Sequence, residues 1–168
     1  MEIGLDLGEV DVEFIIILYI IYIKNSIYFC PIYAYNLSYM EGSGKKMKVL
    51  FVEDEVNIAF LYARAFEQDN FSILNAYTGE EGLIMAKNEK PDFILLDIML
   101  PGMNGLDVLK ELKSSPSTMN IPVILLTNLS DDTTIKEGFA REAAGYVIKS
   151  FHSTKQIIEE VKTILKLS

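Results

Sequence analysis

Residues 93–109 read FILLDIMLPGMNGLDVL and contain one complete copy of the pattern that decides the fold. The four residues at 93–96 form a run that is apolar on both faces, and the polar residue Asp97 ends it. After a turn with Pro and Gly, Leu106 and Leu109, followed by Leu112 just beyond the stretch, recur at the spacing of one helical face. The stretch therefore predicts a buried strand, a loop and a helix.

The same alternation of apolar run and amphipathic segment occurs five times after Met47. The expected strands cover 49–52, 73–77, 93–96, 123–126 and 146–148, and the expected helices cover 58–66, 79–87, 106–112, 131–141 and 157–165. Strands that are apolar on both faces and separated by single helices need a parallel sheet covered on both sides. The prediction is an α/β fold, a doubly wound five-stranded parallel sheet with helices on both faces.

The overall composition suits one globular domain with additional sequence. The chain has 168 residues, of which 50% are hydrophobic, with a net charge of -9, one Cys and one His. An acidic surface repels nucleic acid and anionic lipid, so we expect neither as a direct partner. One Cys cannot form an internal disulfide and one His cannot build a multi-histidine metal site, and the expected compartment is the reducing cytoplasm.

Composition changes near residue 46 and divides the chain into two parts. Residues 47–168 contain all five repeats and are expected to form the domain, whereas residues 1–46 are expected to be an N-terminal extension that is disordered or foreign to the natural protein. The apolar run at 14–23 is about half as long as a membrane-spanning helix, and it follows acidic residues, unlike a secretory signal. A membrane-associated anchor is the alternative for this run.

Polar residues directly follow four of the five expected strands. Glu53 and Asp54 follow the first strand, Asp97 the third, Thr127 the fourth and Lys149 the fifth. Because the carboxyl ends of parallel strands meet at one edge of the sheet, these side chains are expected in one pocket. Carboxylates that share a pocket repel one another unless a cation offsets them. Oxygen ligands with no His or Cys nearby favour Mg2+, with Mn2+ as a substitute.

This combination of groups predicts a carboxylate that attacks phosphorus. A divalent cation and the ammonium of Lys149 would neutralise the phosphoryl oxygens, and the hydroxyl of Thr127 would donate a hydrogen bond to one of them. The expected product is an aspartyl phosphate.

Four motifs in this order extend the interpretation: VLFVEDE (49–55), FILLDIMLPGMNGLDVL (93–109), VILLTNLS (123–130) and GYVIKSF (145–151). Together they resemble the receiver domain of bacterial two-component response regulators, of the stand-alone type found in chemotaxis, over essentially all of residues 47–168. The resemblance implies a flavodoxin-like fold with strand order 2-1-3-4-5. It also implies a phosphoryl group taken from a sensor histidine kinase or a phosphotransfer protein.

The resemblance further implies a role for each residue of the pocket. Asp97 is the expected phosphoacceptor, and the expected Mg2+ ligands are Glu53, Asp54, Asp97 and the backbone carbonyl of Met99. The expected phosphate-binding and switch residues are Lys149, Thr127 and Tyr146, of which the tyrosine turns inward on activation.

The chain also departs from the family pattern. Ser150 stands where the family has a proline with a cis bond, so a trans peptide is expected. Asn128 stands where a very small residue is common, which narrows access to the phosphoryl group. Met99 and Leu129 occupy positions that flank the path of attacking water in the family; both are apolar here, so the resemblance implies slow self-dephosphorylation. His152 is expected to be a surface residue that starts the last helix.

The function expected from these residues is that of a single-domain receiver whose phosphorylation switches its affinity for another protein. We expect the downstream partner at the face formed by the fourth helix, the fifth strand and the fifth helix of the domain. Such a protein is not an enzyme beyond its own phosphotransfer and dephosphorylation. Two alternatives stay open: a degenerate receiver that acts as a phosphorylation-independent adaptor, and an aspartate-nucleophile phosphatase that turns over small phosphate esters.

A chain that begins at Met47 tests the proposed division. Residues 47–168 contain every expected strand of the parallel sheet, so the shortened chain should fold, be more soluble and accept phosphate at Asp97 as the full chain does. Circular dichroism and phosphate incorporation measured on both chains check this. An unfolded or inactive short chain would show that residues 1–46 belong to the domain.

Overall fold

The computed structural model describes residues 28–29, 46–128 and 131–167. They form one six-stranded sheet in the order β1-β6-β5-β4-β2-β3. The strands are β1 (Tyr28–Phe29), β2 (Lys48–Val52), β3 (Ser72–Ala76), β4 (Phe93–Leu96), β5 (Val123–Thr127) and β6 (Gly145–Ile148). All neighbours from β3 to β6 pair in parallel. The predicted order 2-1-3-4-5 is therefore confirmed for these five strands.

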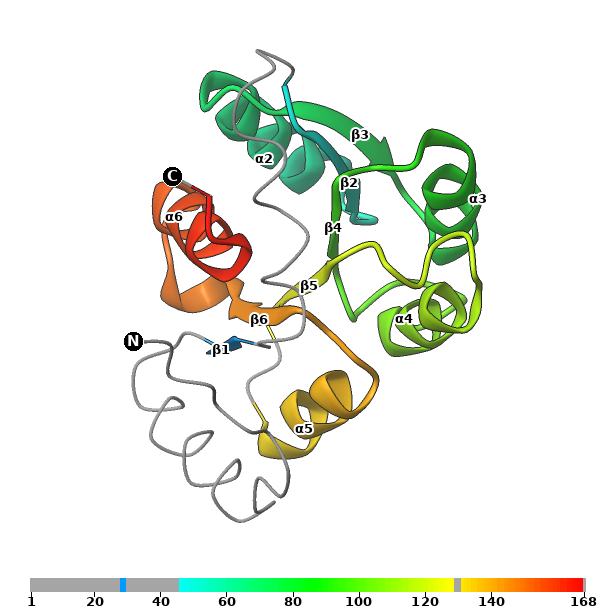
Figure 1. The fold of residues 1–168 in the computed structure, drawn as a ribbon. Helices are drawn as coiled ribbons and strands as arrows, with labels where there is room; N and C mark the ends of the chain where they lie inside the picture. Colours follow the sequence, from blue (N-terminus) through cyan, green and yellow to red (C-terminus); the bar gives the residue numbers. More distant parts are fainter. Residues whose placement is uncertain (1–27, 30–45, 129–130, 168) are drawn as a thin grey trace, which may run out of the picture.

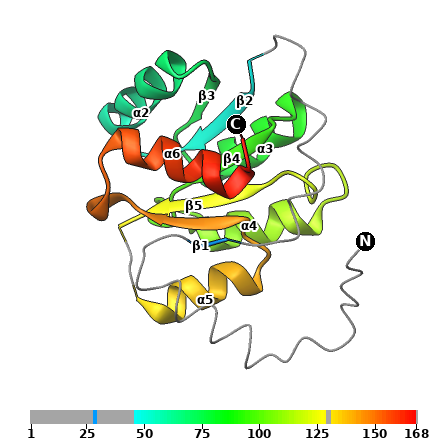
Figure 2. The same ribbon diagram turned by 60° about the vertical axis from the view of Figure 1, so that its left-hand side comes forward.

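Helices cover both faces of the sheet, as predicted (Figure 1). They are α2 (Val56–Gln68), α3 (Gly79–Glu89), α4 (Gly105–Ser114), α5 (Asp132–Ala140) and α6 (Thr154–Leu165), with a 3-10 turn, η2 (Lys149–Phe151), before α6. Helices α2 and α6 lie on one face, and α3, α4 and α5 lie on the other (Figure 2). Among the described residues, no helix is long and apolar enough to cross a membrane.

Alternate residues of each central strand enter two separate cores, because successive side chains of a strand point to opposite faces. In β2, Val49 and Phe51 pack toward α2 and α6, whereas Leu50 and Val52 pack toward α3 and α4. All four residues of β4 are fully buried. A strand that is apolar on both faces thus lies in the middle of the sheet. Asp97 directly follows β4 and is therefore placed at the end of this central strand.

Strand β1 adds a short antiparallel partner at the β6 edge, so the sheet has six strands rather than the predicted five. Tyr28 pairs with Tyr146, and Phe29 pairs with Gly145. An extra strand can join a closed series of βα units only at an exposed edge, and β1 occupies one. The other residues of the segment 1–46, apart from Lys46, lie outside the described residues.

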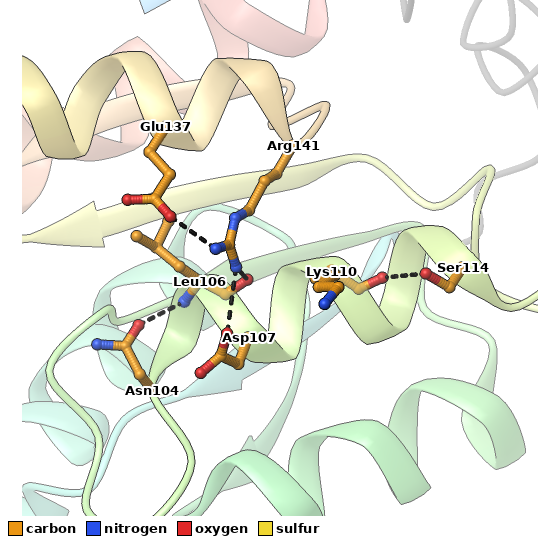
Figure 3. Close-up of polar contacts among 7 residues, drawn as sticks. All are labelled: Asn104, Leu106, Asp107, Lys110, Ser114, Glu137 and Arg141. Carbon is orange, nitrogen blue, oxygen red and sulfur yellow. Dashed lines mark hydrogen bonds and ion pairs between the residues drawn. The ribbon is translucent and has the colours of Figure 1, made fainter.

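The first turn of α4 is held by two side chains (Figure 3). Asn104 caps the helix by accepting a hydrogen bond from the N–H of Leu106 at 2.8 Å. The guanidinium of Arg141, just after α5, donates to the carbonyl of Leu106 at 2.7 Å and to Asp107 at 3.2 Å. It also donates to Glu137 at 2.6 Å. One arginine therefore ties the start of α4 to the end of α5.

Replacing Arg141 by alanine should lower the free energy of unfolding by about 1 to 2 kcal/mol, because three charge-assisted contacts are lost from a side chain that is mostly buried. Urea unfolding measures the change. The matched control is Arg64→Ala, which removes only an exposed contact with Glu67 at 3.8 Å and should cost less than about 0.5 kcal/mol. Equal losses in both variants would contradict this account of Arg141.

Candidate metal and phosphate site

Three carboxylates meet where β2 and β4 end. Val52 and Leu96, the last residues of these neighbouring strands, are paired in register, so the residues that follow them lie side by side. One oxygen from each of Glu53, Asp54 and Asp97 lies within 4.8 Å of the other two. The structure therefore brings together the three side chains that the sequence analysis placed at this edge.

Lys149 reaches into this cluster from the end of β6. Its Nζ donates to Oδ2 of Asp97 at 2.6 Å and also contacts Oε2 of Glu53. Burial acts to lower the pKa of Lys149, but the attraction of the two carboxylates outweighs it and raises the pKa above its usual value. The amine is therefore a cation at neutral pH and bridges the two acids.

Glu53 is the most deeply buried acid of the cluster, with 1% of its surface exposed. Burial raises the pKa of Glu53, and the contact with Lys149 offsets this only in part. When ionised, three carboxylates face one ammonium, which leaves the cluster negative. The donor set consists of oxygens alone, and this fits a hard divalent cation such as Mg2+.

The second oxygen of Asp97 is held by the loop that follows it. Oδ1 accepts a hydrogen bond from the N–H of Met99 at 3.0 Å. Both carboxylate oxygens of Asp97 therefore have a donor, and the carboxylate plane is fixed. The role of the Met99 carbonyl as a metal ligand stays a prediction.

Two glycines let this loop turn back on itself. Gly102 has a φ of 77°, in the region that favours glycine. Gly105 begins α4, and its N–H donates to the carbonyl of Ile98 at 3.0 Å. A Cβ at Gly105 would lie 2.1 Å from the carbonyl oxygen of Asp97. The helix can start this close to Asp97 only because no side chain intervenes.

Thr127 and Tyr146 lie on the two strands beyond β4. Thr127 is the buried last residue of β5 and pairs with Ile148 of β6, next to Lys149. Tyr146 is fully buried and packs with the core beneath α5. Its side chain lies inside the fold in this structure, and the inward turn on activation that the resemblance implies stays a prediction. Leu129 lies outside the described residues, and Asn128 is exposed.

The segment after Lys149 corrects one prediction. All peptide bonds of the described residues are trans, as expected for Lys149 and Ser150. His152, however, is not a freely exposed residue, because only 11% of its side chain is accessible. It contacts Glu160, eight residues later, which the sequence analysis did not single out. The apolar face of α6 was visible in the sequence, but which polar residue turns toward β6 depends on how that helix docks.

Comparison with known proteins agrees with this geometry. The family described as "Response regulator receiver domain" matches residues 49–162. The chain belongs to this receiver family. It is 33% identical over 119 residues to the phosphate regulon transcriptional regulatory protein PhoB of Rhizobium meliloti, which covers 71% of this chain and 52% of that protein. It is 35% identical to the alkaline phosphatase synthesis transcriptional regulatory protein PhoP of Bacillus subtilis, over 72% of this chain and 49% of that protein.

Solved structures show the same fold. The receiver domain of the Francisella response regulator 1452 is 29% identical, with a TM-score of 0.65 over 72% of this chain and 98% of that one. The chemotaxis response regulator CheY4 of Vibrio cholerae is 23% identical, with a TM-score of 0.67 over 71% and 99%. The receiver chain spans about half the length of the curated relatives it matches. The similarity therefore covers the receiver part of those longer proteins and does not extend to the rest of their length.

Mg2+ should stabilise this receiver, because a cation relieves the repulsion among its three carboxylates. At about 100 times its Kd, a ligand that binds only the folded state adds about 2.7 kcal/mol. Asp54→Ala should abolish the Mg2+-dependent rise in Tm and should raise the stability without metal. The matched control is Glu55→Ala, an exposed acid outside the cluster, which should keep the full response. An unchanged response in Asp54→Ala would refute the site.

Proposed function

We propose that this receiver accepts a phosphoryl group on Asp97 from a phosphohistidine of a sensor histidine kinase or a phosphotransfer protein, and that the reaction depends on Mg2+. The observation that carries the proposal is the arrangement around one carboxylate. Lys149 Nζ lies 2.6 Å from Oδ2 of Asp97 and the N–H of Met99 lies 3.0 Å from Oδ1, beside the acids Glu53 and Asp54. A nucleophile, a cation and a cluster of metal-binding oxygens are thus in contact.

The proposed reaction forms a bond between an oxygen of Asp97 and phosphorus while the bond from phosphorus to the donor imidazole nitrogen breaks. The bonding electron pair stays on that nitrogen. A bound Mg2+ would add positive charge against the phosphoryl oxygens. Lys149 already contacts the attacking carboxylate, so its ammonium would lie within reach of the phosphoryl oxygens once the phosphoryl group is bound to Asp97. Thr127, at the adjacent strand end, would donate a hydrogen bond from its hydroxyl to the same group.

The rim of the pocket supports a protein as the phosphate donor. Val56, Met99 and Phe151 each stand two positions after a pocket residue, and each has about 60% of its surface exposed. Large apolar side chains that are exposed close in sequence to charged site residues are typical of a protein-binding surface. A small phosphorylated metabolite would need no such rim. The kinase or phosphotransfer protein is therefore the proposed natural donor, and the proposed compartment is the cytoplasm.

The proposed output is a change in affinity for another protein at the face of α5, β6 and α6. Thr127 is the last residue of β5, and Lys149 directly follows β6. A phosphoryl group that contacts both side chains would therefore act directly on this part of the sheet. The acidic chain, with 24 acidic and 15 basic residues, favours a protein over nucleic acid as the receiver's direct partner. The receiver itself would carry out only its own phosphotransfer and dephosphorylation.

Incubation with Mg2+ and acetyl phosphate, followed by the intact mass of the protein, tests the proposal. The wild-type chain should gain one phosphoryl group, and Asp97→Asn should gain none because the amide is not a nucleophile. The matched control is Asp132→Asn, which changes an exposed aspartate in the first turn of α5 and should be phosphorylated like the wild type.

Other outcomes would identify the alternatives. Equal incorporation by Asp97→Asn would reject Asp97 as phosphoacceptor. No incorporation by the wild-type chain would favour the phosphorylation-independent adaptor. Repeated turnover of a small phosphate ester would favour the aspartate-nucleophile phosphatase.

A further inference from the structure

The direction in which Lys149 leaves the sheet is set by a short backbone turn. Lys149 is the first residue of η2 and directly follows Ile148, the last residue of β6. Proline would stiffen such a turn, but Ser150 stands at the next position. Within the turn, the N–H of His152 lies 3.4 Å from the carbonyl of Lys149, which is long for a hydrogen bond. The turn itself therefore gives Lys149 little support.

The side chain of His152 makes two shorter contacts. Its Nδ1 lies 3.0 Å from the carbonyl oxygen of Ile148, the residue before Lys149. Its Nε2 lies 2.6 Å from Oε1 of Glu160 on α6. The imidazole ring thus connects the backbone at the end of β6 to the last helix.

Both contacts constrain the ring. A carbonyl oxygen can only accept a hydrogen bond, so Nδ1 must carry a proton to bind Ile148. Nε2 faces a carboxyl oxygen, and one proton lies between the two groups whichever of them holds it. With both nitrogens engaged, the ring cannot rotate without breaking a hydrogen bond.

Glu160 is an unusual residue for the buried side of a helix. Only 8% of its surface is exposed, and its second oxygen, Oε2, is buried without a hydrogen-bond partner among the described residues. Burial raises the pKa of Glu160, although the nearby His152 opposes this. A buried carboxyl with an unsatisfied oxygen costs stability that an apolar residue would not. Its position is better explained by what it does to the His152 ring.

We propose that His152 is a positioning residue for phosphotransfer: held by Glu160, it fixes the carbonyl of Ile148 and thereby the place of the Lys149 amine. The peptide unit is planar, so fixing the carbonyl of Ile148 also fixes the nitrogen of Lys149. The Lys149 amine must reach Asp97 at 2.6 Å, and misplacement by about 1 Å can cost up to about a hundredfold in rate. The inference rests on the proposed function and adds a residue outside the pocket to it.

Two substitutions of His152 separate its two contacts. His152→Asn places an amide N–H near the position of Nδ1 and can still bind the carbonyl of Ile148. His152→Gln extends to the position of Nε2 and keeps only the contact with Glu160. Phosphorylation of Asp97 by acetyl phosphate should be about tenfold slower or more in His152→Gln and within about threefold of the wild type in His152→Asn.

Both substitutions are repeated in a Glu160→Gln chain. The neutral glutamine leaves no buried carboxylate without its histidine partner, so these variants should still fold. The Mg2+-dependent rise in Tm should persist in the His152 and Glu160 variants, because the three carboxylates are untouched. Lys149→Ala sets the rate without the amine, and adding His152→Gln to it should cause no further loss, because His152 acts through Lys149. Equal rates for the Asn and Gln variants, or a further loss in the double variant, would overturn the proposal.

A readout without phosphate separates this proposal from the proposed function. In 1H–15N NMR spectra, the Lys149 amide signal should shift in His152→Gln and stay near its wild-type position in His152→Asn. If the wild-type chain takes no phosphate but this difference is seen, the proposed function fails and the positioning of Lys149 stands. If phosphate is taken up but the amide signal is the same in both variants, the positioning role fails alone.

Discussion

The contact of one ammonium with two carboxylates is the interaction on which the rest of this receiver depends. Lys149 binds Asp97 and Glu53. The three residues follow three different strands: Glu53 follows β2, Asp97 follows β4 and Lys149 follows β6. None of these groups would be stable in a buried place alone, because an unpaired charge in a protein interior costs several kcal/mol. The order of the parallel strands, the two apolar cores and the loop after Asp97 together hold the three side chains in contact.

Charge balance at the pocket also explains what the arrangement can do. The single ammonium cannot neutralise Glu53, Asp54 and Asp97 together when all three are ionised, so the cluster carries a net negative charge. At the same time both oxygens of Asp97 are held by donors, which orients the carboxylate before any reaction. The proposed phosphoryl transfer requires both a negative cluster that can hold a cation and an oriented carboxylate, and the same few residues supply both.

The sequence predicted most of this arrangement and missed specific parts of it for physical reasons. The five parallel strands, and the ends where Glu53, Asp97 and Lys149 lie, follow from apolar runs whose length and spacing are visible in one dimension. The burial of His152 was not predicted, because it depends on which residue of α6 faces β6 after the helix has docked. The pairing of β1 likewise depends on which sheet edge is open.

The missing side chain at Gly105 has a consequence for mechanics. Because the backbone of α4 begins against the carbonyl of Asp97, there is no compressible layer of side chains between them. A displacement of the Asp97 backbone toward α4 cannot be absorbed by a rotamer change and must move the end of the helix. Arg141 then joins that end of α4 to α5 through hydrogen bonds (Figure 3). The receiver thus contains a direct mechanical connection that runs from the backbone of Asp97 through the start of α4 to helix α5.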